Sequence, residues 1–255
     1  MSWKLPDYWR ENAHATKPRG EFRGFGLSAR LEAVAGCVGI GARVIDVGTD
    51  HGLLPIALIG SGRASFAIAG DLRPDPLSVA ASNVRRFRKE EKVELRLADG
   101  LEALKPNEAD TVTIAGMSGE RMVEILLAVD LEKLGVSRII VQPNSDQVEL
   151  RQKMTLAGWE VVHERLVACG GRMYVVIVLE AAGEDHSITQ DDAWVGPILK
   201  NHPADPLYRA WCDVMRGLLT KRVNGLSRGS PGSIELEKGR AQLAAFEALD
   251  TDKTS

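Results

Sequence analysis

Three aspartates stand in or directly after short apolar runs of this 255-residue sequence, at Asp46, Asp71 and Asp99. If these runs are neighbouring parallel strands, their carboxyl ends meet at one edge, where such sheets bind ligands. A carboxylate at Asp71 could accept hydrogen bonds from both hydroxyls of a ribose, and one at Asp99 could accept a hydrogen bond from an adenine amino group. Asp71 or Asp99 alone is more often a helix cap or a solvated strand end. Their shared position predicts a pocket for a nucleoside-containing ligand.

A glycine turn follows the first of these runs. Gly48 allows the turn to bring backbone N–H groups close to a ligand, and Gly52 keeps its far side open. The spacing differs from the Gly-x-Gly-x-x-Gly pattern of dinucleotide sites and puts Asp50 and His51 where a pyrophosphate would lie. Negative charge there argues against a dinucleotide and favours a cationic ligand.

The elements that must position these residues follow an alternating order. Stretches with helical spacing separate five short apolar runs, which predicts a parallel sheet with crossover helices. Two longer runs then follow, joined by Cys169-Gly170-Gly171, a connection that fits only an antiparallel hairpin. The short runs are 42–47, 65–71, 93–98, 110–115 and 137–142, and the hairpin runs are 160–168 and 172–180.

A mostly parallel sheet that ends in an antiparallel hairpin resembles the Rossmann-like α/β fold of class I S-adenosylmethionine-dependent methyltransferases. Within that group the chain is similar to the bacterial tRNA (adenine-22 N1)-methyltransferase family, TrmK, from about Leu27 to Leu249. Three motifs carry most of this likeness: the Asp-His pair in the first glycine turn, Ala115-Gly116-Met117-Ser118-Gly119 after the fourth strand, and Gln142-Pro143-Asn144 after the fifth.

The resemblance implies S-adenosyl-L-methionine as cofactor, tRNA as partner and methyl transfer to N1 of an adenine in the D-arm region, at position 22. Asp46 and Asp50 would face the cationic methionine part of the cofactor, and Asp50 could stabilise positive charge developing on the purine. The expected cofactor contacts are Asp46, Gly48, Asp50, His51, Asp71, Leu72, Ala98, Asp99, Gly100, Ala115, Gly116 and Met117. The expected catalytic residues are Asp50, Gln142 and Asn144, and the expected substrate contacts are Arg30, Pro143 and Asn144.

Several of these residues also have plain structural interpretations. Gln142-Pro143-Asn144 could grip the edge of a purine or could form a simple turn. His51 could orient the base or the cofactor, although a lone histidine is more often structural. Arg30 lies in an amphipathic stretch expected across the entrance of the pocket. There it could bind tRNA phosphate or the cofactor carboxylate, or lie on the surface as an ordinary arginine.

Composition limits the alternatives. Cys37, Cys169 and Cys212 fit neither a zinc site nor a disulfide framework, so we expect no metal and a reducing cytoplasm. No apolar stretch approaches the ~20 residues that span a membrane. The net charge of −3 is unusual for a tRNA-binding protein, but residues 1–30 hold six Lys and Arg against three Asp and Glu.

We predict three regions. Residues 1–26 form a basic, aromatic extension that could bind RNA, lack order or pack on the domain. Residues 27–186 form the S-adenosylmethionine-binding domain. Residues 187–255 form a coiled-coil appendage, with helices at 205–226 and 234–249 and a turn at 227–233. The returning helix would use an apolar side made of Ala241, Ala244, Ala245 and Ala248.

The helical appendage could grip tRNA, form a dimer contact or simply pack, so we expect a monomer or a weak homodimer. Two other functions remain open from the residues. One is a class I methyltransferase that acts on a small molecule or a protein, which would not need Gln142 and Asn144 to hold a purine. The other is a binding module of the same fold without turnover, which would bind the cofactor weakly or not at all.

Overall fold

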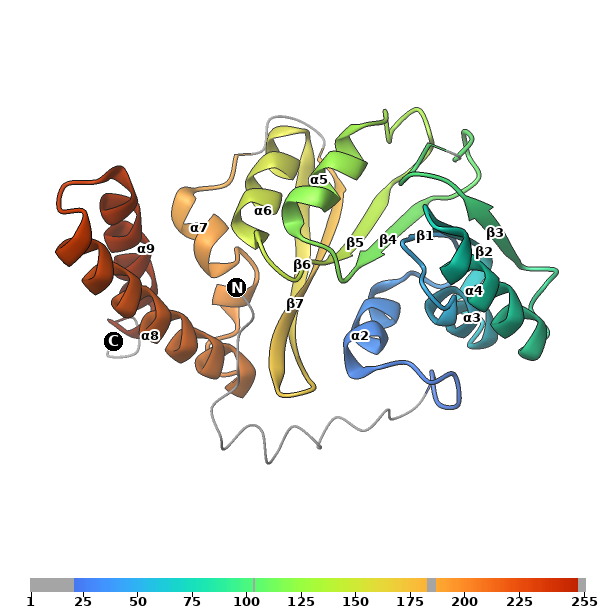
Figure 1. Cartoon of the computed structure of the whole chain (residues 1–255), viewed down its shortest axis with the longest axis horizontal. Helices are drawn as coiled ribbons and strands as arrows, with labels where there is room; N and C mark the ends of the chain where they lie inside the picture. Colours follow the sequence, from blue (N-terminus) through green and yellow to red (C-terminus); the bar gives the residue numbers. More distant parts are fainter. Residues whose placement is uncertain (1–20, 103, 183–186, 252–255) are drawn as a thin grey trace.

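The computed structural model describes residues 21–102, 104–182 and 187–251 (Figure 1). Its centre is a seven-stranded sheet in the order β3-β2-β1-β4-β5-β7-β6. The strands are β1 (Ala42–Val47), β2 (Ala64–Asp71), β3 (Val93–Leu97), β4 (Thr111–Ala115), β5 (Arg138–Gln142), β6 (Trp159–Cys169) and β7 (Arg172–Ala181). The helices beside the sheet are α2 (Ala29–Cys37), α3 (Leu53–Gly60), α4 (Pro74–Arg86), α5 (Gly119–Leu127) and α6 (Gln147–Leu156).

The strand pairing confirms the predicted sheet. Strand β1 pairs in parallel with β2 and β4, and β7 runs antiparallel to both β5 and β6. The tight turn between β6 and β7 uses Gly170 and Gly171, whose φ angles of 58° and 72° are those that a type I′ turn requires. All of the carboxyl ends of β1 to β5 therefore meet at one edge, because these five strands run in the same direction.

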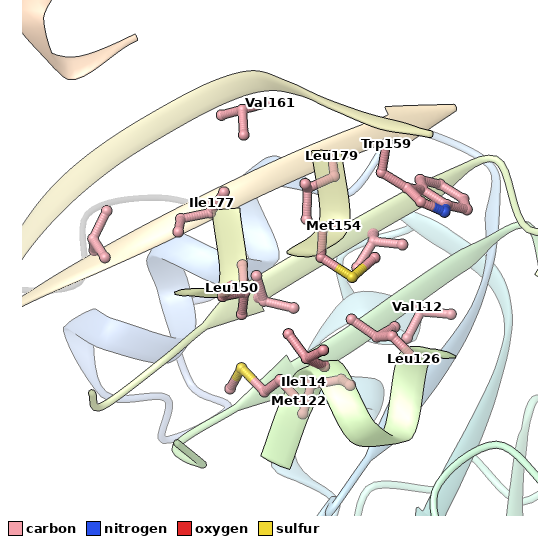
Figure 2. Packing of buried hydrophobic residues seen from close by; sticks show 14 of the residues in the cluster. Val112, Ile114, Met122, Leu126, Leu150, Met154, Trp159, Val161, Ile177 and Leu179 are labelled. Atoms are coloured by element: carbon pink, nitrogen blue, oxygen red, sulfur yellow. The ribbon is translucent and has the colours of Figure 1, made fainter. Parts of the chain in front are cut away.

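Helices cover both faces of the sheet (Figure 1). Helices α2, α3 and α4 lie on one face, and α5 and α6 lie on the other. The apolar residues of β4, such as Val112 and Ile114, pack against Met122 and Leu126 of α5 (Figure 2). Burial on both faces explains why the parallel strands β1, β2, β4 and β5 read as apolar runs, whereas the edge strand β3 is largely exposed or half-buried.

The C-terminal elements extend beyond the β6 edge of the sheet (Figure 1). They are α7 (Gln190–Val195), the 3-10 turn η2 (Leu199–Asn201), α8 (Pro206–Gly229) and α9 (Ile234–Thr251). Trp211 of α8 meets the edge of Phe246 of α9, with ring centroids 5.2 Å apart. Both residues belong to the same buried cluster as the α5–α6 face of the sheet, so the helical hairpin is anchored at its base.

Two details of the predicted hairpin are wrong. Helix α8 continues to Gly229, so the turn is shorter than 227–233. The buried side of α9 includes Leu236 and Phe246, whereas Ala241, Ala244 and Ala248 are exposed. Large apolar side chains set the register of the helix because burying them removes far more apolar surface from water than burying alanine does.

Only the end of the predicted N-terminal extension can be described, since residues 1–20 lie outside the described residues. Phe25 packs against Phe87, with ring centroids 5.8 Å apart. Arg63 lies over the ring of Phe22 and pairs with Glu21 at 2.9 Å. This part of the extension therefore packs on the domain, one of the alternatives that the sequence left open.

Candidate functional site

A pocket of about 320 Å³ lies at the carboxyl ends of the parallel strands. Loops after β1, β2, β3 and β4 line it together with the first turns of α5. Its lining residues are Val47, Gly48, Asp71, Leu72, Arg73, Ala98, Asp99, Gly100, Ala115, Gly116, Met117, Arg121 and Ile125. Nine of these are among the residues predicted to contact the cofactor, so the expected strand ends do converge on one pocket.

The floor of the pocket is formed where the first glycine turn meets the loop after β4. Gly48 has a φ of 71°, and a Cβ atom built on it would collide with the methyl group of Met117. Gly52 has a φ of 69° and is the N-cap of α3, in the left-handed conformation that glycine adopts most easily. Because Gly48 has no side chain, the backbone of the turn faces the pocket directly.

Asp71 is the best-placed acceptor of the pocket. It ends β2, is 5% exposed, and its carboxylate accepts hydrogen bonds from the backbone N–H of Arg73 at 2.9 Å and of Asp50 at 3.4 Å. A carboxylate has about four acceptor sites. The guanidinium of Arg73 also lies 3.6 Å from this carboxylate, beyond hydrogen-bond distance, so acceptor sites remain for the two hydroxyls of a ribose.

Asp50 and His51 lie beside the pocket without lining it. Asp50 has a φ of 52°, and its carboxylate lies 3.3 Å from Nε2 of His51. Both side chains are more than half exposed. The main-chain oxygen of His51 accepts a hydrogen bond from Asn83 at 2.9 Å, which fixes the turn against α4.

Asp99 pairs with Arg121, an arginine of α5 that sequence reasoning missed. The two side chains meet at 2.8 Å, and each is 45% exposed. Arg73 also lines the pocket and was missed. Ser118 is a signal of where α5 begins, because it caps the helix by accepting from the backbone N–H of Arg121 at 3.2 Å. A helix that begins there places Arg121 in its first turn, next to the strand ends. The mouth of the pocket thus carries both charges and is less acidic than the aspartates alone suggested.

Asp46 is placed differently from the sequence expectation. It is 4% exposed and does not line the pocket, and its carboxylate accepts a hydrogen bond of 2.8 Å from the hydroxyl of Thr113 on β4. Burial raises the pKa of Asp46 to about 6, against the opposing effect of the Thr113 hydrogen bond. Asp46 therefore joins β1 to β4 behind the first turn.

The loops after β4 and β5 are joined by several hydrogen bonds. The side-chain amide of Asn144 donates to the main-chain oxygen of Gly116 at 2.7 Å. The backbone N–H of Asn144 donates to the main-chain oxygen of Met117 at 2.8 Å. Gly116 N–H donates to the main-chain oxygen of Gln142 at 3.0 Å. Asn144 is exposed, whereas Pro143, which lies between Gln142 and Asn144, is buried. The loops after β4 and β5, here called the rim, therefore form one connected unit, and Gly116 and Met117 bring this unit to the pocket.

Arg30 reaches this rim from α2. Its guanidinium donates to Oε1 of Gln142, lies over the ring of Tyr174 at 5.7 Å, and is close to Gly116. Gln142 is 0% exposed, and its amide donates to the main-chain oxygen of Pro143 at 3.0 Å and to Oδ1 of Asn144 at 3.3 Å. This geometry favours a positioning role for Gln142 over the direct purine contact expected from the sequence.

The donor and acceptor set suits S-adenosylmethionine. Asp71 retains acceptor sites for a ribose, Leu72 offers a 60% exposed apolar side chain next to the pocket, and the glycine turn leaves room for close backbone approach. Asp99 can accept from an adenine amino group with the lone pairs that Arg121 leaves free. These residues therefore fit the group that the sequence implied.

A larger groove of about 1240 Å³ lies between α6, β7 and the C-terminal helices. It contains none of the strand-end aspartates described above, so we assign the methyl-transfer chemistry to the smaller pocket. In the described part of the chain, no cluster of His, Cys, Asp and Glu could hold a metal ion. None of the described helices combines the length and apolar character that crossing a membrane requires.

Comparisons with known proteins show which family the chain resembles. A family described as "Methyltransferase domain" matches residues 27–177. A curated protein of Bacillus subtilis, the tRNA (adenine(22)-N(1))-methyltransferase, is 36% identical over 159 residues, which cover 62% of this chain and 67% of that protein.

Solved structures are similar over most of the chain. The crystal structure of B. subtilis TrmK has a TM-score of 0.78 and 26% identity, covering 88% of this chain and 99% of that one. A Streptococcus pneumoniae protein, described as a putative tRNA (m1A22) methyltransferase in complex with S-adenosyl-L-methionine, has a TM-score of 0.74 and 32% identity, with coverages of 88% and 99%. The family match, the sequence identity and the shared fold show that the chain belongs to the TrmK family of tRNA methyltransferases.

Proposed function

We propose that this protein transfers the methyl group of S-adenosylmethionine to N1 of an adenine in tRNA. The observation that carries the proposal is the strand-end pocket, which Asp71 and Asp99 line together with Gly116 and Met117 of the rim. The relatives with solved structures support both the cofactor and the substrate class.

The reaction needs positioning more than it needs a base. N1 of adenine carries a lone pair in the plane of the ring, so it can attack a methyl group without first losing a proton. S-adenosylmethionine supplies an electrophilic methyl group when it is bound. Holding the two reacting atoms in line at near-attack distance can lower the barrier by about 7 to 11 kcal/mol. The protein therefore contributes to the reaction by holding the cofactor pocket and the rim at a fixed distance, which sets the distance between the methyl group and N1 of adenine.

Asn144 is the residue that we propose to contact the target base. It is exposed at the rim, and its side chain already donates one hydrogen bond to Gly116 and accepts one from Gln142. One amide hydrogen and one lone pair remain for the edge of a purine. Arg30 and Gln142 hold this amide in its orientation, while Pro143 shapes the loop. These roles identify Asn144 as the direct contact and the others as positioning residues.

Asp50 is proposed to stabilise the product. Methylation at N1 makes the purine cationic, and Asp50 is an exposed carboxylate beside the pocket. A carboxylate near developing positive charge lowers the barrier if it is already in place before the reaction. The φ of 52° at Asp50 is consistent with a backbone held in place by the surrounding turn.

We also propose the finer features implied by the family. The target is the adenine at position 22 in the D-arm region, the reaction takes place in the cytoplasm, and the protein acts as a monomer or a weak homodimer. A class I methyltransferase acting on a small molecule or a protein would use the same cofactor pocket, but no observation at the rim favours it.

The test is direct. The protein is incubated with S-adenosylmethionine labelled on its methyl group and with bulk bacterial tRNA, and the modified nucleoside is then mapped. We expect label in 1-methyladenosine at position 22. Transfer to another base, or none while the cofactor binds, would refute the substrate assignment.

A further inference from the structure

A buried ion pair lies between the catalytic domain and the C-terminal helices. Arg151 of α6 and Glu164 of β6 have side chains that are 1% and 0% exposed. Oε1 of Glu164 accepts from Nε of Arg151 at 2.7 Å and lies 2.7 Å from its Nη2. Burying two charges is costly unless their remaining groups are also hydrogen-bonded. The hydrogen-bond partners of Nη1 of Arg151 and Oε2 of Glu164 therefore indicate the structural role of this ion pair.

The remaining groups bind the segment that leads into α8. Nη1 of Arg151 donates to the main-chain oxygen of Ala193 at 2.9 Å. Oε2 of Glu164 accepts from the backbone N–H groups of Ile198 at 3.0 Å and Leu199 at 3.3 Å. Arg151 and Glu164 thus each bind the main chain of this connecting segment in addition to binding each other.

Gly196 shows how closely this segment approaches the carboxylate. It has a φ of 88°, and a Cβ atom built on it would lie 2.9 Å from Oε2 of Glu164 and 2.9 Å from Cδ1 of Leu199. A side chain at this position would push the segment away from Glu164. Glycine at position 196 therefore allows the connecting segment to contact the carboxylate of Glu164 closely.

Helix α6 links this pair to the methyl-transfer rim. It begins at Gln147, directly after the loop that follows β5 and carries Asn144, and the main-chain oxygen of Ser145 accepts a hydrogen bond of 2.9 Å from Gly119 N–H. Arg151 lies near the middle of the same helix. One short helix therefore connects the rim at its start to the C-terminal segment through Arg151.

We propose that Arg151 and Glu164 are positioning residues that fix the α8–α9 hairpin at a set distance and angle from the methyl-transfer rim. A large, folded substrate such as tRNA is wide enough to contact both parts, and its binding then depends on their relative placement. The cofactor pocket lies at other strand ends and does not depend on it. This inference rests on the proposed function, because it requires tRNA to be the substrate.

The pair is best tested by removing both charges together. E164Q alone would leave the Arg151 charge unpaired in the core, which is strongly destabilising. The double variant R151M/E164Q contains no buried charge at this place and keeps a side-chain oxygen that can accept from Ile198 or Leu199. Replacing both members of a buried pair is often nearly neutral for stability, so this variant is expected to fold.

The measurements are the KM for full-length tRNA, the kcat at saturating tRNA, the dissociation constant for S-adenosylmethionine and the melting temperature. We expect the tRNA KM of R151M/E164Q to rise about tenfold, as for other residues that couple two sites. The cofactor dissociation constant and kcat should change less than about twofold. The control is D130N, which removes an exposed ion pair between Asp130 and Lys133 and should change none of these values.

Three outcomes overturn the inference. An unchanged tRNA KM in a folded double variant shows that the pair does not position tRNA. A parallel loss of cofactor affinity shows a general structural role. If the wild-type protein binds cofactor but methylates no tRNA, the proposed function itself fails, and this inference fails with it. The first two results leave the proposed function intact, so the two failures can be told apart.

Discussion

Asn144 donates a side-chain hydrogen bond of 2.7 Å to the main-chain oxygen of Gly116 and so joins the loop after β5 to the loop after β4. Gly116 lines the cofactor pocket, whereas Asn144 is exposed at the rim. The residue proposed to hold the purine is thus bonded to a residue expected to contact the cofactor. This side-chain bond adds to the backbone hydrogen bonds between the two loops and holds the amide of Asn144 in a fixed place relative to the cofactor pocket.

Replacing Asn144 with alanine should therefore slow methyl transfer more than it weakens cofactor binding. We expect kcat/KM for tRNA to fall about 100-fold, the size of effect that a misplacement of about 1 Å can produce. The backbone hydrogen bond from Gly116 to Gln142 remains, so the cofactor pocket should keep its shape. Steady-state kinetics and a cofactor titration measure the two effects separately.

S65A is the matched control. Ser65 also donates from its side chain to a main-chain oxygen, that of Gly41 at 2.9 Å, at the amino end of β2 and away from the pocket edge. The S65A variant should lose a similar small amount of stability while keeping its activity. If S65A and N144A lose activity equally, the bond to Gly116 has no special part in the reaction.

Gly48→Ala should weaken cofactor binding. The substitution adds a Cβ atom that collides with Met117, and it forces alanine into a left-handed conformation that costs about 1 to 2 kcal/mol. Gly62→Ala provides the comparison, since Gly62 has a similar φ of 77° and open space around it. We expect at least a tenfold loss of cofactor affinity for G48A and none for G62A. Equal affinities in a calorimetric titration would show that the turn does not touch the cofactor.

Asp46 should make the stability of the protein depend on pH. Its pKa is raised to about 6 in the folded state from 3.8, so the folded protein holds this proton more tightly than the unfolded chain. Stability should therefore fall as pH rises from about 4 to about 6, by roughly 3 kcal/mol at most. Asp46→Asn lacks this titration. Urea unfolding at pH 4 and pH 7 should show the wild type losing stability relative to D46N, and parallel changes would contradict this assignment.

Asp50→Asn tests the proposed stabilisation of the cationic product. Asparagine tolerates the positive φ at this position, so the turn should be preserved while the charge is removed. We expect the single-turnover rate of methyl transfer to fall about tenfold with little change in cofactor affinity. A variant with full activity and unchanged affinity would exclude Asp50 from the reaction.

The sequence was sufficient to predict the sheet and most of the pocket lining. Parallel strands buried on both faces produce apolar runs, and the residue at the carboxyl end of each run must lie at the ligand-binding edge. Asp71, Asp99 and the glycines after β1 and β4 were therefore found without coordinates. The double-glycine turn at Gly170 and Gly171 likewise permitted only a hairpin.

Side-chain direction and distant contacts could not be predicted in this way. Asp46 lies inside β1 and bonds to Thr113 on the neighbouring strand, a partner 67 residues away in sequence. Gln142 is enclosed by Arg30, 112 residues away. The register of α9 depends on the packing of Phe246 against Trp211, which helical spacing alone does not specify. Each of these features is a tertiary contact that overrides a local pattern.

The central claim is that the strand-end pocket binds S-adenosylmethionine through the carboxylate of Asp71. The direct measurement is an isothermal calorimetric titration of folded protein with S-adenosylmethionine, for the wild type, D71A and D75A. Asp75 is exposed in the first turn of α4 and serves as the control, because it lies outside the pocket. We predict saturable binding at one site for the wild type and D75A, and at least tenfold weaker binding for D71A, which loses charge-assisted hydrogen bonds. No binding heat from well-folded wild-type protein across several temperatures, or equal affinities for wild type and D71A, would contradict the account.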